Sequence, residues 1–124
     1  MVLRYLWLAL LALAPGLFTG PALAQASQQQ QYVVVYVEFL PAAAHQGGNK
    51  LNQLALLAHS SAGLVSFNVN QQLQRPNFYS LVEIWKDATA YQNFSSSADT
   101  QTLLNAIQPL LEAPFDYRPG NLVE

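Results

Sequence analysis

The chain has 124 residues, which is enough for one ordinary domain. Its net charge is −2 and it has no basic cluster, so nucleic acid is not expected as a partner. It has no cysteine, which excludes disulfides, a thiol nucleophile and thiolate metal ligands.

Residues 1–24 are typical of a secretory signal peptide. Arg4 gives the start a positive charge, Tyr5–Phe18 is almost wholly apolar, and Ala22-Leu23-Ala24 has the small-x-small pattern of a cleavage site. We therefore expect export to the periplasm or the medium, with no stable membrane anchor after cleavage. Residues 25–31 are polar and glutamine-rich, which predicts a short spacer before a domain of residues 32–124.

The segment Tyr32–Leu40 predicts the first strand, which Pro41 ends. It does not alternate between apolar and polar residues, a pattern typical of a strand that is covered on both faces.

The segment Ala42–Ser61 predicts a helix, because Leu51, Leu54, Ala55 and Ala58 recur at helical spacing. The pair Gly47-Gly48 conflicts with this prediction, since each glycine costs a helix interior about 1 kcal/mol relative to alanine. The alternative is a helix that begins only at Asn49.

The segment Leu64–Leu73 predicts a second strand in which Val65, Phe67 and Val69 lie on one face. The opposite face carries polar side chains, among them Asn68, and either meets water or lines a cavity. We expect Arg75-Pro76-Asn77 to form the turn that follows.

The stretch from Asn77 to Ala90 is the most informative part of the sequence. It predicts a strand that runs directly into a helix capped by Asp87. Alternation places Tyr79, Leu81, Glu83 and Trp85 on one face and Phe78, Ser80, Val82 and Ile84 on the other. A carboxylate among such bulky apolar neighbours must be paired, hydrogen-bonded or protonated if it is buried. The alternative is an edge position from which Glu83 reaches solvent.

The C-terminal third predicts helices at Ala88–Ser96 and Thr100–Leu111, with a kink or an early end at Pro109. A last strand, Phe115–Arg118 with Leu122-Val123, would be interrupted by Pro119-Gly120. The order is β-α-β-β-α-β, an α+β fold of the ferredoxin-like kind with both helices on one face of the sheet. The doubly apolar first strand argues against a bare second face, so we expect two sheets to pack together in a homodimer.

The segment from Pro76-Asn77-Phe78 to Glu83-Ile84-Trp85-Lys86-Asp87 resembles the turn and Glu-x-Trp-x-Asp motif of the antibiotic biosynthesis monooxygenase family. Gly63, the Val-x-Val first strand and Pro114-Phe115-Asp116 also fit, so the resemblance covers about Tyr32 to Val123. It implies a dimeric α+β barrel like that of the small quinol monooxygenases.

The resemblance implies an enzyme that oxidises a small aromatic or quinol-like compound with dioxygen and needs no flavin, haem or metal. The protein would supply a dry aromatic pocket, a base and donors for the developing oxyanion. Trp85 would wall the pocket and Glu83 would be the base. Tyr36 and Asn68 could donate to a ring oxygen if they face the helices, and Tyr91 and Phe94 could close the pocket. Packing in the core or at a dimer interface is the alternative role for each of these residues.

The sequence departs from the family at a helix histidine that many members carry in an Ala-x-x-x-His pattern. By spacing, Phe94 and Asp99 take the places of this and a second histidine. The only histidines, His45 and His59, lie on or near the first helix without metal-ligand spacing, so we predict no metal site. The missing histidine leaves a second hypothesis open, a non-catalytic dimer that binds hydrophobic small molecules. It also argues against a haem-degrading relative, which would use a helix histidine and a first-strand asparagine.

Overall fold

The computed structural model describes residues 29–123. The elements in chain order are strand β1 (Gln31–Glu38), 3₁₀ helix η1 (Pro41–Ala43), helix α2 (Ala44–His59), strands β2 (Leu64–Gln72) and β3 (Arg75–Trp85), helices α3 (Ala88–Ser96) and α4 (Ala98–Ile107), 3₁₀ helix η2 (Gln108–Leu110) and strand β4 (Asp116–Gly120). The predicted signal peptide and most of the predicted spacer lie outside the described residues. The last residue of that spacer, Gln31, is already part of β1.

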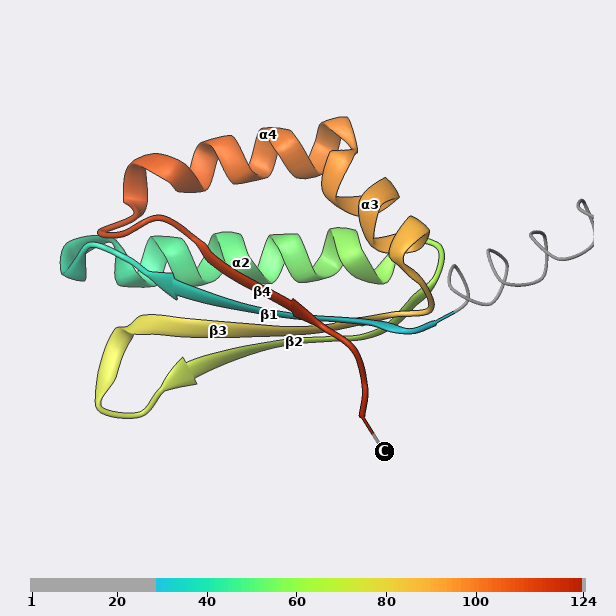
Figure 1. Ribbon diagram of the computed structural model, residues 1–124. Coiled ribbons are helices and arrows are strands. Elements are labelled where there is room, and N and C mark those ends of the chain that lie inside the picture. The colour runs from blue at the N-terminus through green and yellow to red at the C-terminus, as the bar shows by residue number, and fades with distance from the viewer. Residues whose placement is uncertain (1–28, 124) are drawn as a thin grey trace, which may run out of the picture.

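The strands form one antiparallel sheet in the order β2-β3-β1-β4. The helices lie on one side of this sheet, as Figure 1 shows. This arrangement confirms the predicted ferredoxin-like α+β fold. Within residues 29–123, no helix is both long and apolar enough to cross a membrane.

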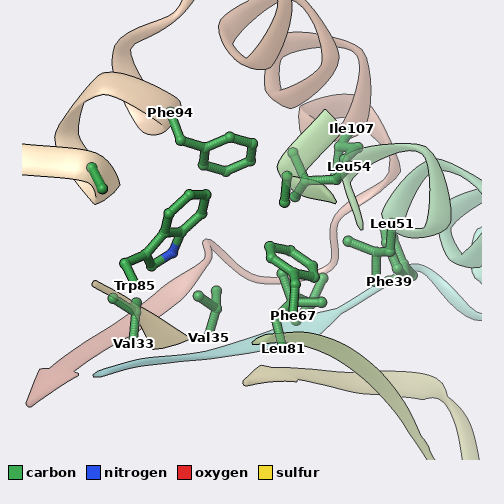
Figure 2. Close-up of a cluster of buried hydrophobic side chains, with 13 residues drawn as sticks. Val33, Val35, Phe39, Leu51, Leu54, Phe67, Leu81, Trp85, Phe94 and Ile107 are labelled. Atoms are coloured by element: carbon green, nitrogen blue, oxygen red, sulfur yellow. The ribbon is translucent and has the colours of Figure 1, made fainter. Parts of the chain in front are cut away.

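The core fills the space between the sheet and the helices (Figure 2). Val33, Val35 and Val37 point into it from β1, and Leu81 and Trp85 point into it from β3. Helix α2 contributes its predicted apolar stripe, in which Leu51, Leu54 and Ala58 are buried and Ala55 is partly buried. The predicted faces of β3 are therefore confirmed, with Glu83 and Trp85 on the covered side.

Helix α2 runs through Gly47 and Gly48, so the alternative start at Asn49 is wrong. Both glycines are buried, and a β-carbon on Gly47 would lie 2.5 Å from the ring of Phe39. A β-carbon on Gly48 would collide with the hydroxyl group of Tyr79. The cost of two glycines in a helix is offset by close packing of these aromatic side chains against the backbone.

The connection between β2 and β3 differs from its prediction. The turn lies at residues 73–74, and Arg75, Pro76 and Asn77 already belong to β3. A register irregularity between Gln71 and Gln72 accommodates Pro76, whose ring removes a ladder donor. A second irregularity, near Leu64, turns Val65 outward, so its predicted place beside Phe67 is wrong.

The C-terminal elements follow the prediction with three differences. Helix α4 begins at Ala98 because the hydroxyl oxygen of Ser97 caps it, accepting from the backbone N–H of Thr100 at 3.3 Å. It ends at Ile107, and Pro109 lies in η2, which is the early end that the proline predicts. Pro119-Gly120 does not interrupt β4 but completes it, since an edge strand tolerates proline, and residues 122–123 are not in a strand.

The sheet face that no helix covers carries an apolar stripe along the two central strands. We call it the outer stripe; its members are Tyr32, Val34 and Tyr36 of β1 and Phe78, Val82 and Ile84 of β3. Polar side chains border it, with Asn68 and Asn70 on β2 and Asp116 and Arg118 on β4. All six members are at least partly exposed, so the described residues leave this face open.

Candidate active site

Glu83 is a buried carboxyl group on the covered face of β3, with 4% of its surface exposed. Strand β3 lies between β2 and β1, so the alternative of an edge position that reaches solvent is wrong. Within residues 29–123, the one ion pair joins Arg118 to Asp116 and leaves Glu83 without a cationic partner. A carboxyl group in this setting favours its neutral form.

Burial raises the pKa of Glu83 from 4.5 to about 7. The indole Nε1–H of Trp85 donates to Oε1 of Glu83 at 3.1 Å, and this hydrogen bond lowers the pKa and so opposes part of the effect of burial. The carboxyl group therefore changes its protonation near neutral pH, which is the range that suits a general base.

Aromatic rings surround the indole of Trp85, which is completely buried. Phe94 stacks on it, with ring centroids 4.9 Å apart and an interplanar angle of 29°. Tyr91 lies 6.3 Å from it at a tilt, and Phe67 meets Phe94 edge to face. Strand β3 and helix α3 thus form an apolar wall next to the carboxyl group of Glu83. Figure 2 shows Phe94 facing the indole of Trp85.

A small cavity of about 30 Å³ lies against Glu83. Its lining comes from both layers of the fold: Val35, Leu54, Leu81, Glu83, Tyr91, Phe94, Ser95, Thr100, Leu104 and Tyr117. This volume has room for one or two water molecules and is too small for an aromatic ring.

An open hollow of about 300 Å³ adjoins the cavity. The two spaces share the side chains of Tyr91, Ser95, Leu104 and Tyr117, which come from α3, α4 and β4. The shared side chains lie where the cavity beside Glu83 meets the open hollow. The site is therefore a small, partly open cavity, which we call the chamber, beside an open hollow, which we call the mouth.

Two tyrosines stand at this mouth, and their hydroxyl groups remain protonated at neutral pH. Burial first, and then the nearby carboxylate of Glu83, raise the pKa of Tyr91 to about 12. The same two causes raise the pKa of Tyr117. Each tyrosine can therefore donate a hydrogen bond to an oxyanion beside Glu83.

Tyr117 and Thr100 are members of the site that the sequence did not indicate. Tyr117 reaches it because β4 pairs with β1 in the register that sets Tyr117 opposite Val35. Thr100 is buried, and its hydroxyl oxygen accepts a hydrogen bond of 2.8 Å from the hydroxyl group of Ser97. The alternation of apolar side chains around Tyr117 was a weak signal, because it does not show which face of β4 the helices cover.

Tyr36 and Asn68 lie on the opposite side of the sheet from Glu83. Tyr36 is 49% exposed, and the amide of Asn68 donates to the hydroxyl oxygen of Ser66 at 3.0 Å. Their predicted role as donors required that they face the helices, and this condition is not met. Val33, Val35 and Val37 take the inward positions of β1, and Phe67 and Val69 take those of β2. Of the predicted site residues, the structure brings together Glu83, Trp85, Tyr91 and Phe94. Trp85 lines neither the cavity nor the hollow, because Phe94 covers its ring, so its predicted place in the pocket wall is wrong.

Among the described residues, no three His, Asp or Glu side chains gather closely enough to hold a metal ion. The polar and aromatic groups that line the cavity are the carboxyl of Glu83, hydroxyl groups and aromatic rings. This inventory allows proton transfer, hydrogen bonding to an oxyanion and ring stacking.

Residues 31–106 match the sequence model of a family described as antibiotic biosynthesis monooxygenase. No curated protein matches the sequence significantly.

Many solved structures share the fold. A candidate antibiotic biosynthesis monooxygenase from Caulobacter crescentus superposes with a TM-score of 0.73 at 16% identity, over 82% of this chain and 96% of that one. A conserved protein from Methanosarcina mazei gives a TM-score of 0.71 at 17% identity, over 79% and 97%. A Bacteroides thetaiotaomicron protein of unknown function, described as a possible oxidoreductase, gives 0.71 at 14% identity, over 77% and 99%. At these identities the likeness is one of fold.

Proposed function

Because the chain belongs to the antibiotic biosynthesis monooxygenase family, we propose that it oxidises a small electron-rich phenol or hydroquinone with dioxygen, without flavin, haem or metal. The observation that carries this proposal is the buried carboxyl group of Glu83, which titrates near neutral pH beside an aromatic wall and beneath an open mouth. A buried, unpaired carboxylate is costly for stability, and a role in catalysis accounts for its presence.

In the proposed reaction, Glu83 takes a proton from a ring hydroxyl group of the substrate. The resulting anion is electron-rich enough to reduce dioxygen directly. One oxygen atom forms a bond to a ring carbon and the other leaves as water, while the four electrons come from the hydroquinone, which becomes a hydroxyquinone. Tyr91 and Tyr117, which line the cavity, would donate to the negative oxygen, and the apolar wall would exclude water from the anion.

We also propose that the protein acts as a homodimer. The outer stripe is an apolar surface with a polar border, which suits the central part of an interface between two copies. The isolated sheet would leave this face to water, whereas a second sheet packed on it would cover both central strands. The helix side, with the chamber, would remain free.

We further propose that the protein is exported, with residues 1–24 removed on the way. The support is the pattern of charge, apolar run and cleavage motif in the sequence. The substrate would then be a compound of the periplasm or the medium.

A second candidate function has one observation in its favour. By spacing, Phe94 takes the helix position at which the family resemblance implies a histidine in many members, and its ring can neither donate nor accept a proton. This substitution suits a dimer that binds a hydrophobic small molecule without turning it over.

The two functions separate in a labelling experiment. Purified protein is mixed with menadiol or a small hydroquinone under ¹⁸O₂, and the product is analysed by mass spectrometry. A monooxygenase inserts one labelled atom into the ring faster than the uncatalysed reaction does. A binding protein that changes neither the rate nor the labelling would contradict the proposed activity.

A further inference from the structure

Phe94 covers the face of the Trp85 indole that looks toward the helix layer. Its ring lies 4.9 Å from the indole in a stacked geometry, and it is 6% exposed. Figure 2 shows it lying over the indole from the side of the helix layer. The distance and angle are those of a favourable aromatic pair.

With Phe94 in this position, the cavity beside Glu83 is too small for an aromatic ligand. The cavity beside Glu83 is about 30 Å³, whereas an apolar cavity of roughly 150 Å³ is known to hold benzene. A ring that is to meet both Glu83 and Trp85 therefore needs more room than the structure offers. Phe94 is the aromatic side chain that lines this cavity and also stacks on the indole, so its ring fills the missing space.

Helix α3 is lightly anchored, which makes displacement of this ring feasible. The helix has nine residues, and only Ala90 and Phe94 on it are buried. Its ends are held by Asp87, which accepts from Ala90 N–H at 2.8 Å, and by Ser97. A helix this short has little stability of its own and depends on such contacts.

We propose that Phe94 is a plug that mimics the substrate ring, and that a ligand enters by displacing it from Trp85. This inference rests on the proposed function, because it takes the proposed aromatic ligand as the molecule that competes with Phe94. It makes Phe94 a residue that sets the affinity and the size limit of the site. Ligands of one ring are then the class that the vacated space accepts.

The test is the binding of phenol, measured by calorimetry on the purified protein in the absence of dioxygen. We expect Phe94→Ala to bind phenol at least tenfold more tightly than the unchanged protein. In the proton NMR spectrum, the signal of the Trp85 indole N–H should shift when phenol binds. Comparison with the spectrum of Trp85→Phe assigns this signal. No turnover is needed, so a failure of the oxygenase proposal would not mask the result, and a failure here would leave oxygen uptake unaffected.

Phe67→Ala is the matched control. Phe67 is a buried phenylalanine that touches Phe94 but lines neither the cavity nor the mouth. Its truncation should leave phenol affinity unchanged. If Phe94→Ala does not fold, Phe94→Leu is the second variant, with an expected gain of about threefold. Folded Phe94 variants that bind phenol no better than the unchanged protein, or an equal gain in Phe67→Ala, would overturn the proposal.

Discussion

The two faces of β3 have nearly the same apolar character in sequence and different fates in the structure. The face toward the helices carries Leu81, Glu83 and Trp85, all of which are buried. The opposite face carries Val82 and Ile84, which stay partly exposed on the outer stripe. The helix layer makes the difference, because burial beneath it is the largest cause of the raised pKa of Glu83. One strand can therefore serve a reactive site on one side and an association surface on the other.

The largest expected effect is the loss of stability on removal of a large buried side chain from the covered face. Trp85→Ala should lower the free energy of unfolding by about 3–5 kcal/mol, because it removes a fully buried indole. Leu73→Ala, at the fully exposed turn after β2, should change it by less than about 0.5 kcal/mol. Urea unfolding followed by circular dichroism measures both variants. Equal losses in the two would mean that the covered face is not the core.

Burial of Glu83 on the covered face of β3 should make the stability of the protein depend on pH. The pKa of Glu83 is higher in the folded protein, about 7, than in the unfolded chain, about 4.5, so the folded state binds the proton more tightly. Protonated Glu83 therefore contributes about 3 kcal/mol to the free energy of unfolding. This contribution is complete below pH 4.5 and is lost as the pH rises through 7.

Glu83→Gln cannot titrate and serves as the reference for this effect. The difference in unfolding free energy between the two proteins, measured in urea from pH 4 to 8, should change by about 3 kcal/mol in favour of the variant as the pH rises. A difference that stays constant over this range would show that Glu83 is not buried in a dry site.

The proposed dimer interface on the outer stripe can be tested separately from the covered face. Val34→Arg on the outer stripe should raise the dimer dissociation constant by about 30-fold or more, because it places a charge at the centre of the proposed interface. Leu73→Lys introduces a charge at the turn, away from the stripe, and should leave the dimer intact. Light scattering over a dilution series gives both constants. A protein that is monomeric without any substitution would contradict the dimer proposal directly.

The smallest expected effect concerns a single hydrogen bond on the covered face. In the unchanged protein, the hydrogen bond from the Trp85 N–H lowers the pKa of Glu83. Trp85→Phe removes this N–H. The pKa of Glu83 should therefore rise, by up to about one unit. NMR titration of the carboxyl carbon measures it, and a lower pKa in the variant would show that the indole does not stabilise the carboxylate.

The order of the elements and the two faces of β3 could be predicted because a strand alternates and because Glu83 breaks an otherwise apolar pattern. The same reasoning failed on β1, where Tyr36 and its neighbours are apolar on both faces and give no sign of which side the helices cover. The side of Asn68 stayed open for a related reason, since a polar face fits both a cavity and solvent. Pairing with the next strand decides these cases, and local sequence does not report it.

The site was predictable in its centre and not at its mouth. Glu83, Trp85, Tyr91 and Phe94 lie within one continuous stretch of sequence. Strand alternation paired Glu83 with Trp85, and the family resemblance added Tyr91 and Phe94. Tyr117 joins them through the pairing of β4 with β1, far along the chain. Gly47 and Gly48 also required tertiary knowledge, because packing of Phe39 and Tyr79 explains why the helix tolerates them.

The most direct test of Glu83 as the proton acceptor is the pH dependence of oxygen uptake with a small hydroquinone, after subtraction of the uncatalysed rate. We expect kcat/KM of the unchanged protein to rise with pH through an apparent pKa of about 7, the value for Glu83. Glu83→Gln should lose at least about 100-fold in rate, together with this rise. A variant that keeps both the rate and the rise would contradict the central role of Glu83.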